Sequence, residues 1–316
     1  MNGVRPSNEE LSDLGFGARV TQTAKQRLLN RDGSFNVLRR KLPFFRSLSP
    51  YHFLLKISWT KFYLLVVASY MVFNMVFAAG YFAIGRGGLV GGEETTEEGR
   101  FTEDFFFSVQ TSTTLGYGRV APIGIASNVL ASIEALAGLL GFALATSLMF
   151  ARFSTPDARI MYSNHAIISP YRGIQGVMFR IANERSNQLI RVGVQVLLSR
   201  LEFTQAGSAR RFHTLLLERE EVVFFPLTWT VVHPIDERSP LHALTEAEFR
   251  RSDPEILVLL TGVDETFSQT VYSRSSYKGD EIVWGAKFMD TFQQSPEGML
   301  SVDLQKIHDF ELVPRA

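Results

Sequence analysis

The stretch TTLGYG at residues 113–118 holds two glycines and one aromatic residue within six positions. Glycine adopts positive φ angles without steric cost, so successive backbone carbonyls in this stretch can point the same way. A row of carbonyl oxygens aimed at one axis replaces the water shell of a dehydrated cation. One chain cannot surround an ion in this way, whereas four copies can. An ordinary glycine turn is the alternative, and the flanking elements decide between the two.

Two long apolar stretches flank this motif. Residues 62–85 carry no charged side chain, and at ~1.5 Å per residue a helix of that length crosses the ~30 Å hydrocarbon core of a bilayer. Residues 123–151 carry a single charge, Glu134. We therefore predict two transmembrane helices.

Between these stretches, TEDFFFSVQTS predicts a short helix that begins at Thr102 as N-cap, with Glu103 and Asp104 in its first turn. It is too short to cross a bilayer, yet it contains three consecutive phenylalanines, which favours a re-entrant helix. Irregular backbone at membrane depth is tolerated only where protein buries it or where it lines a water-filled path. This setting favours an ion-binding role for residues 113–118 over a plain turn.

The remaining chain divides into three further parts. Residues 1–42 are expected to form a cytoplasmic N-terminal segment, and residues 1–40 are polar and expected to be mostly loose. Residues 43–58 mix aromatic and basic side chains, which is typical of an interfacial amphipathic helix, although a surface helix on a soluble domain has the same pattern. Residues 154–316 show short apolar runs separated by turn residues, which predicts an all-β soluble domain.

The distribution of charge predicts the topology and excludes several kinds of site. Basic residues precede the first apolar stretch, whereas the loop between the two stretches is acidic, so the positive-inside rule places both termini in the cytoplasm. The net charge of zero gives no general attraction to nucleic acid. The absence of cysteine excludes disulfides and thiolate sites. His213, His233 and Asp236 lack a convergent nucleophile, so we expect no enzyme and no cofactor.

The order of apolar span, short helix, TxGYG and second span resembles the pore of potassium channels. Three further motifs, VVHPIDERSPL, YSRSSY and DEIVWGAKF, resemble the inward rectifier potassium channel family, in its bacterial KirBac branch. The resemblance covers roughly residues 35–310. It implies a membrane α plus β protein: a two-transmembrane-helix potassium-channel pore at 59–153, with its re-entrant pore helix and filter at 102–118, and a cytoplasmic immunoglobulin-like β-sandwich. It also implies a homotetramer in the bacterial inner (plasma) membrane.

The resemblance assigns roles around the filter. The filter itself matches five residues: Thr114, Leu115, Gly116, Tyr117 and Gly118. The carbonyls of the first four are implied to hold the permeant K+. Leu115 replaces the usual valine or isoleucine. Gln110 stands where many relatives have a glutamate that braces the loop together with a basic residue, here Arg119. Glu134 either braces the filter from behind or lines the cavity and attracts cations.

Gating and regulation are implied at other positions. Phe142 and Phe150 are candidates for hydrophobic gate rings, although packing against the first span would explain either one. Phe142 also occupies the family's acidic polyamine site, so we expect weak cavity-based rectification. The cytoplasmic pore loop matches four residues: Glu265, Thr266, Phe267 and Ser268. Anionic lipid, such as phosphoinositide, is expected to bind a set of five basic residues: Arg40, Lys41, Lys56, Lys61 and Arg152.

Three functions therefore compete. The first is a passive potassium-selective channel of the inward rectifier type. The second is a membrane-anchored β-sandwich binding module, which would need neither TTLGYG nor a re-entrant helix. The third is a nonselective cation channel, in which Leu115 has loosened the filter.

Overall fold

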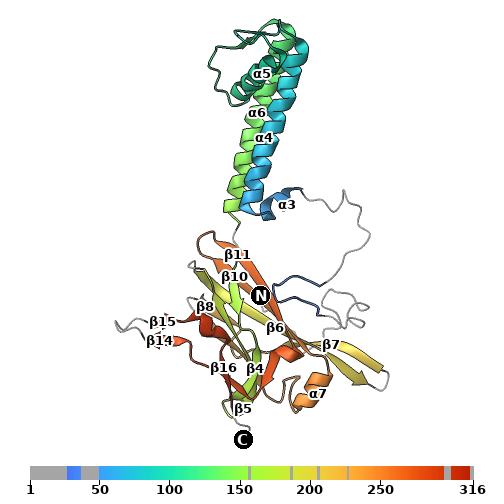
Figure 1. The fold of residues 1–316 in the computed structure, drawn as a ribbon. Helices are drawn as coiled ribbons and strands as arrows, with labels where there is room; N and C mark the ends of the chain where they lie inside the picture. Colours follow the sequence, from blue (N-terminus) through green and yellow to red (C-terminus); the bar gives the residue numbers. More distant parts are fainter. Residues whose placement is uncertain are drawn as a thin grey trace, which may run out of the picture. The chain divides into compact units, whose positions relative to one another are not determined.

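A computed structural model of the chain describes residues 27–36, 50–155, 158–185, 188–204, 207–225, 228–294 and 300–313. The chain forms two compact units (Figure 1). Residues 40–155 make up a helical unit, whereas residues 1–39 and 156–316 make up a β-rich unit. We describe each unit separately.

Within its described residues 50–155, the helical unit contains four helices and a small two-stranded sheet. Its elements, in chain order, are α3 (Pro50–Lys56), α4 (Trp59–Ile84), β1 (Leu89–Val90), α5 (Glu97–Ser112), β2 (Ala121–Pro122) and α6 (Gly124–Phe153). The long helices α4 and α6 run side by side, and α5 packs against both of them (Figure 1). The prediction of two long apolar helices with a shorter helix between them is thus confirmed in this unit.

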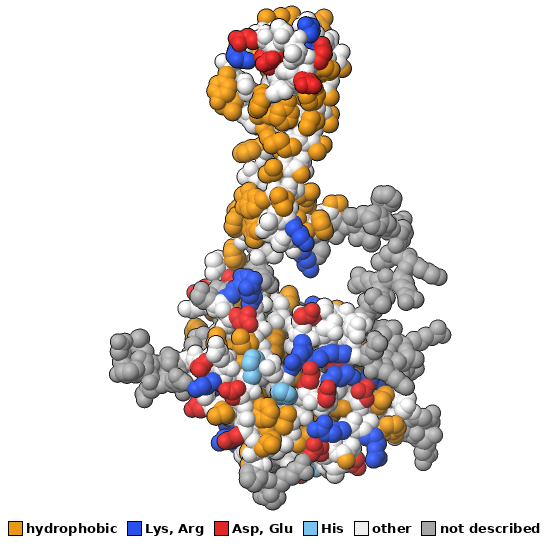
Figure 2. Space-filling view, viewed as in Figure 1, with side chains coloured by type: hydrophobic (Ala, Val, Ile, Leu, Met, Phe, Trp, Pro, Cys, Tyr) orange, Lys and Arg blue, Asp and Glu red, His pale blue; other side chains and the backbone are white. Residues whose placement is uncertain are grey.

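The long helices α4 and α6 are long and apolar enough to cross a membrane. Only 17% of the most apolar window of α4, and 6% of that of α6, is buried within the chain, whereas the core helix of a soluble protein is mostly buried. Aliphatic side chains such as Leu64, Val72 and Leu144 point outward with more than half of their surface exposed. Figure 2 shows hydrophobic side chains distributed over the surface of the helical unit. Lipid or other copies of the chain would cover such a surface.

The short helix α5 begins earlier than the sequence predicts. Thr96, not Thr102, is its N-cap, because the Thr96 hydroxyl accepts the amide of Gly99. Thr102 lies inside the helix, where its hydroxyl donates to the carbonyl of Glu98 at 2.9 Å. Both threonines precede two acidic residues, so the local signal for a helix start is the same at both positions. The longer helix places Glu103 in its second turn rather than its first.

The interfacial helix predicted at 43–58 is described only from residue 50 onward. There, α3 covers residues 50–56, and Ser58 caps the next helix by accepting the amide of Lys61. Residues 43–49 lie outside the described part of the chain. Tyr51 and Phe53 are both well exposed, which agrees with aromatic side chains on the surface of an amphipathic helix.

The β-rich unit is built on two five-stranded sheets. The first contains β6 (Leu189–Thr204), β7 (Gly207–Leu215), β8 (Glu221–Phe225), β10 (Glu255–Asp264) and β11 (Gln269–Lys278). The second contains β3 (Ile160–Tyr162), β4 (Ala166–Tyr171), β5 (Ile174–Asn183), β9 (Thr228–Ile235) and β12 (Ile282–Trp284). Two small sheets add β13 (Ala286–Phe288) with β16 (Phe310–Leu312), and β14 (Phe292–Gln294) with β15 (Leu300–Val302). The helical pieces are α7 (Glu246–Arg251), η1 (Gly279–Glu281) and η2 (Leu304–His308).

The two large sheets pack face to face around one core. In β6, Val194, Val196 and Leu198 are buried, and in β10 Val258 and Leu260 are buried with them. This spacing of two is the pattern of a strand with one face toward the core. The opposing sheet contributes Ile168, Phe179 and Val231, among others, to the same cluster. The arrangement is a β-sandwich, as the sequence predicts.

Residues 27–36, within the stretch expected to be mostly loose, form no helix or strand but are packed against the β-rich unit. This segment packs on the outer face of the first sheet, where Leu28 and Leu29 are buried against Phe212 and Leu257. The amides of Leu28 and Leu29 donate to the fully buried carboxylate of Glu255 at 3.0–3.1 Å. These amides are satisfied by a residue more than 200 positions away in the chain, so no local sequence signal marks the segment as ordered.

Candidate functional site: a carbonyl row after the short helix

The segment at residues 114–118 alternates in backbone handedness. Thr114, Gly116 and Gly118 have φ angles of 61°, 52° and 81°, whereas φ is not positive at Leu115 or Tyr117. In a chain that alternates in this way, successive peptide planes face the same direction, so amides line one side and carbonyls the other. Glycine supplies two of the three positive angles at no steric cost. The alternation is what a row of carbonyl ligands requires.

Hydrogen bonds identify which side of this segment faces the helix. The amides of Leu115 and Gly116 both point at the carbonyl oxygen of Gln110, at 2.9 and 3.4 Å. Gln110 lies in the last turn of α5, so the amides of Leu115 and Gly116 face α5. Leu115 and Tyr117 are 56% and 74% exposed in the single chain. Leu115 and Tyr117 therefore lie on a surface that this chain does not cover.

A buried polar network lies behind α5. Glu134 of α6 is fully buried, and the hydroxyl of Tyr81 donates to its carboxylate at 2.6 Å. The hydroxyl of Ser108 donates to the other carboxylate oxygen. One α5 turn later, Ser112 donates to the side-chain oxygen of Asn74 at 2.9 Å. The network joins α4, α5 and α6, and it places Glu134 against α5 rather than on an open surface.

Close packing of α6 on the end of α5 depends on Gly138. A Cβ at this position would lie 2.4 Å from the carbonyl oxygen of Ser112 and 2.9 Å from its Cα. No heavy atom of the chain lies within 4 Å of the equivalent point at Gly141. Gly138 thus allows the backbones of the two helices to meet directly before the carbonyl row, and Gly141 has no such role within the single chain.

The basic residue just past the row does not pair with Gln110. Arg119 forms an ion pair with Glu103 at 3.1 Å, from the second turn of α5. The sequence analysis names Glu103 only as a first-turn acid and misses this contact. Arg119 and Glu103 are sixteen residues apart, so their proximity depends on how the loop folds back.

The candidate gate residues both lie on α6 with their rings exposed. Phe142 and Phe150 each have 73% of their surface accessible in the single chain. Packing of either ring against α4 within the same chain would bury it, so the exposure argues against that alternative. The rings are therefore available to line a space shared by several copies of the chain.

The loop at residues 265–268 connects β10 to β11 and is shaped by Asp264. Its carboxylate accepts the amides of Thr266 and Phe267 at 2.9 and 3.1 Å. Glu265, Thr266, Phe267 and Ser268 are exposed, and Ser268 has a φ of 52°. Asp264 itself is 2% exposed. The sequence analysis names the loop but not the aspartate that holds it.

The predicted lipid-binding residues fall into three groups. Arg40 and Lys41 lie outside the described residues. Lys56 and Lys61 are exposed at the ends of α3 and α4. Arg152 is engaged instead: its guanidinium donates to the carbonyls of Leu54 and, at 2.6 Å, Ile57, and lies over the rings of Trp59 and Phe62. The positive charge of Arg152 is therefore used to attach α3 to α6.

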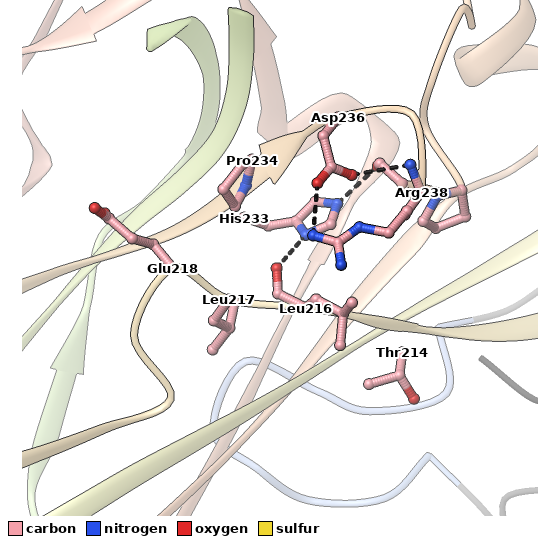
Figure 3. A pocket seen from close by; sticks show the side chains of 10 residues that line it. Thr214, Leu216, Leu217, Glu218, His233, Pro234, Asp236 and Arg238 are labelled. Carbon is pink, nitrogen blue, oxygen red and sulfur yellow. Dashed lines mark hydrogen bonds and ion pairs between the residues drawn. The ribbon is translucent and has the colours of Figure 1, made fainter. Parts of the chain in front are cut away.

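His233 of the β-rich unit is held by structural contacts. His233 lies beside a shallow pocket with Asp236 and Arg238 (Figure 3). Its Nδ1 donates to the carbonyl of Leu216 at 2.6 Å, and its Nε2 lies 2.8 Å from the Ser239 hydroxyl. Burial lowers the pKa of His233, although the Leu216 carbonyl and Asp236 oppose the shift. Within the described ranges no group of three or more His, Cys, Asp or Glu side chains is placed to hold a metal ion.

Comparison with known proteins agrees with this geometry. The family described as "Ion channel" matches residues 64–155, and the family described as "Inward rectifier potassium channel C-terminal domain" matches residues 160–316. The chain is 44% identical to "Inward rectifier potassium channel Kirbac3.1" of Paramagnetospirillum magnetotacticum, over 93% of this chain and 98% of that protein. It belongs to the inward rectifier potassium channel family. It is also 30% identical to the human "G protein-activated inward rectifier potassium channel 3", over 92% of this chain and 79% of that protein.

Membership in the inward rectifier family confirms three predictions. The resemblance drawn from the TxGYG layout and the three C-terminal motifs is correct. The fold class, a two-helix channel pore joined to a β-rich domain, is correct. The expectation that the protein is a channel rather than an enzyme is also correct.

Proposed function

We propose that this inward rectifier is a homotetrameric, potassium-selective channel that conducts passively through a filter at residues 114–118. The observation that carries the proposal is the alternation of φ at Thr114, Gly116 and Gly118, together with the amides of Leu115 and Gly116, which donate to the Gln110 carbonyl on α5. Four such rows around one axis replace the hydration shell of K+. The exposure of Leu115 and Tyr117 supports a covering partner, and further copies of the chain are the partner that a four-fold filter needs.

Three residues near the filter hold it in place in this proposal: Glu134, Gln110 and Arg119. Glu134, buried between Tyr81 and Ser108, acts as a brace for α5 in this proposal rather than as a cavity charge. Gln110 contributes its backbone carbonyl, which accepts two amides of the filter. The third supporting residue, Arg119, follows the filter directly. None of these residues exchanges with the ion, since the ligands are backbone carbonyls.

Gating in this proposal occurs on α6. Rings of Phe142 and Phe150 from four copies form apolar constrictions that close the path by excluding water. Because Phe142 is not acidic, it cannot attract polyamines, and rectification at the cavity is weak. Glu265 and its loop neighbours lie along the cytoplasmic part of the ion path, where they supply an acidic side chain for blocking cations.

The proposal places the channel in the bacterial inner membrane with both termini in the cytoplasm. Anionic lipid headgroups bind the exposed Lys56 and Lys61, each of which contributes ~1 kcal/mol near a negative surface. Arg40 and Lys41 extend this basic set in the sequence. Arg152 is a weaker candidate than the sequence suggests, because its guanidinium already serves α3.

Rubidium uptake tests the proposal. The full-length protein is reconstituted into liposomes loaded with K+, and uptake of external rubidium-86 is measured with and without barium. We expect barium-sensitive uptake that external K+ suppresses and external Na+ does not. Equal suppression by both ions would replace the proposal with a nonselective cation channel, and a Gly116→Asp variant that conducts as the wild type would remove the filter assignment.

A further inference from the structure

The side chain of Glu103 joins α5 to two separate segments of the chain. One carboxylate oxygen accepts the amide of Glu93 at 3.0 Å and the guanidinium of Arg119 at 3.1 Å. The other oxygen accepts the amide of Glu94 at 3.3 Å. Residues 93 and 94 belong to the loop before α5, whereas Arg119 follows the last filter residue, Gly118. One carboxylate on α5 therefore holds both the loop that precedes the helix and the strand that leaves the filter.

Close backbone contacts show that this meeting point is built tightly. Gly91 has a φ of 88°, and a Cβ there would fall 1.8 Å from the carbonyl oxygen of Arg119. A Cβ at Gly92 would fall 2.6 Å from a carboxylate oxygen of Glu103. The two glycines thus permit the loop to lie directly on the backbone of Arg119 and on the side chain of Glu103.

The same loop is paired with the chain beyond Arg119. In the small sheet, Val90 of β1 lies opposite Ala121 of β2, and Leu89 lies opposite Pro122. The amide of Ile123 donates to the carbonyl of Gly88 at 2.8 Å. The segment that leaves the filter is consequently held along its length by the loop, and the loop is held to α5 by Glu103.

The difference in charge explains why Arg119 pairs with Glu103 and not with Gln110. A glutamine amide is neutral and cannot form an ion pair with Arg119. The side chain of Glu103 is 15% exposed and that of Arg119 is 62% exposed, so the pair by itself is worth little in water. The two backbone amides strengthen the site because charge-assisted hydrogen bonds are roughly twice as strong as neutral ones. The Glu103 carboxylate is therefore the fixed group, and it restrains the side chain of Arg119.

We propose that Glu103 is a positioning residue for ion selectivity, which fixes the outer end of the filter through Arg119. This inference rests on the proposed role of residues 114–118 as the filter. Arg119 is covalently joined to Gly118, so a restraint on its side chain and backbone limits the movement of the last carbonyls in the row. The loop before α5 shares the restraint, since its amides of Glu93 and Glu94 donate to the same carboxylate.

The test compares ion competition among matched variants of the full-length channel in liposomes. The measured quantity is the ratio of Na+ to K+ concentrations that halve rubidium-86 uptake. For Glu103→Gln we expect this ratio to fall about tenfold, the change that corresponds to losing one charge-assisted contact. Glu98→Gln is the control, because it removes the same charge from an exposed position on the same helix. We expect its ratio to match that of the wild type.

Substitutions of Arg119 distinguish an effect on the position of the filter from an effect on folding. Arg119→Gln alters an exposed side chain, so the protein is expected to assemble normally while its ratio falls. Arg119→Lys keeps a cation for Glu103 and is expected to restore most of the ratio. The double variant Glu103→Gln with Arg119→Gln is expected to be no worse than Glu103→Gln alone, since contacting residues do not act additively.

Two results would overturn the inference while leaving the filter in place. One is a wild-type ratio in both Glu103→Gln and Arg119→Gln. The other is a double variant whose loss equals the product of the single losses, which would show that the two residues act independently. A wild-type channel that does not discriminate between Na+ and K+ would instead refute the filter assignment itself, and the role of Glu103 with it.

Discussion

Replacing Gly138 by alanine places a methyl group against the backbone at the end of α5. The added Cβ would lie 2.4 Å from the carbonyl oxygen of Ser112 and 3.0 Å from its carbonyl carbon, and neither atom can rotate away as a side chain would. One helix must shift by a few tenths of an ångström or more. Ser112 stands two residues before Thr114, so the shift is passed to the start of the filter.

The size of the effect follows from two opposing contributions. Overpacking a close contact costs about 1–3 kcal/mol. Alanine in place of glycine within a helix raises the free energy of unfolding by about 1 kcal/mol. Gly141→Ala in the same helix has the second contribution without the first, because its added Cβ meets no atom of the chain within 4 Å. The difference in stability between the two variants therefore isolates the steric cost, about 1–3 kcal/mol per subunit.

The assay is thermal unfolding of the purified channel in detergent, followed by rubidium-86 competition in liposomes. We expect Gly138→Ala to melt below both the wild type and Gly141→Ala, and to discriminate less well between K+ and Na+. If Gly138→Ala melts at or above Gly141→Ala and keeps wild-type selectivity, then Gly138 is not a close-packing residue. In that case Gly138 would contribute flexibility to α6 rather than a close contact with α5.

Four further predictions follow from the described contacts. Glu134→Leu should lower the melting temperature far more than Glu134→Gln, because leucine leaves the buried hydroxyl of Tyr81 without its acceptor, at about 1–3 kcal/mol, and leaves Ser108 with Asn74 alone. Phe150→Ala should raise rubidium-86 uptake at unchanged selectivity if the exposed ring forms the gate, and unchanged uptake would reassign the ring. Asp264→Ala should speed proteolytic cleavage at residues 265–268, whereas Asp264→Asn, which keeps an acceptor oxygen, should not. Burial lowers the pKa of His233 below its usual 6.5, so the stability that the neutral ring contributes is present above pH 6.5 and is lost as the pH falls below it. The melting temperature of the wild type should therefore fall more steeply than that of His233→Gln between about pH 7 and pH 5.

Most of the architecture could be predicted because it depends on local pattern. The uncharged run of α4, the phenylalanines of α5 and the alternation in β6 and β10 each extend over enough residues to identify an element. TTLGYG could be interpreted because a glycine-rich stretch at membrane depth has few uses. The backbone alternation at Thr114 goes beyond this, since no sequence rule assigns a positive φ to that threonine.

Contacts between distant residues could not be predicted. Thr96 and Thr102 offer the same capping signal, and the choice between them depends on how the preceding loop closes on Glu103. The pairing of Arg119 with Glu103 depends on the same closure. The ordering of Leu28 and Leu29 requires the buried carboxylate of Glu255, which lies 227 positions away from Leu28. Arg152 carries the charge expected of a lipid ligand, but only the folded position of α3 reveals that carbonyl oxygens already bind it.

The reversal potential under bi-ionic conditions tests the central claim most directly. The full-length channel is placed in a planar bilayer with K+ on one side and Na+ on the other, and the voltage at which the current is zero is measured. A carbonyl filter at residues 114–118 predicts a reversal potential displaced strongly in the direction expected for K+ permeation, and its loss in Gly116→Asp. A barium-sensitive current that reverses near zero voltage would contradict the claim.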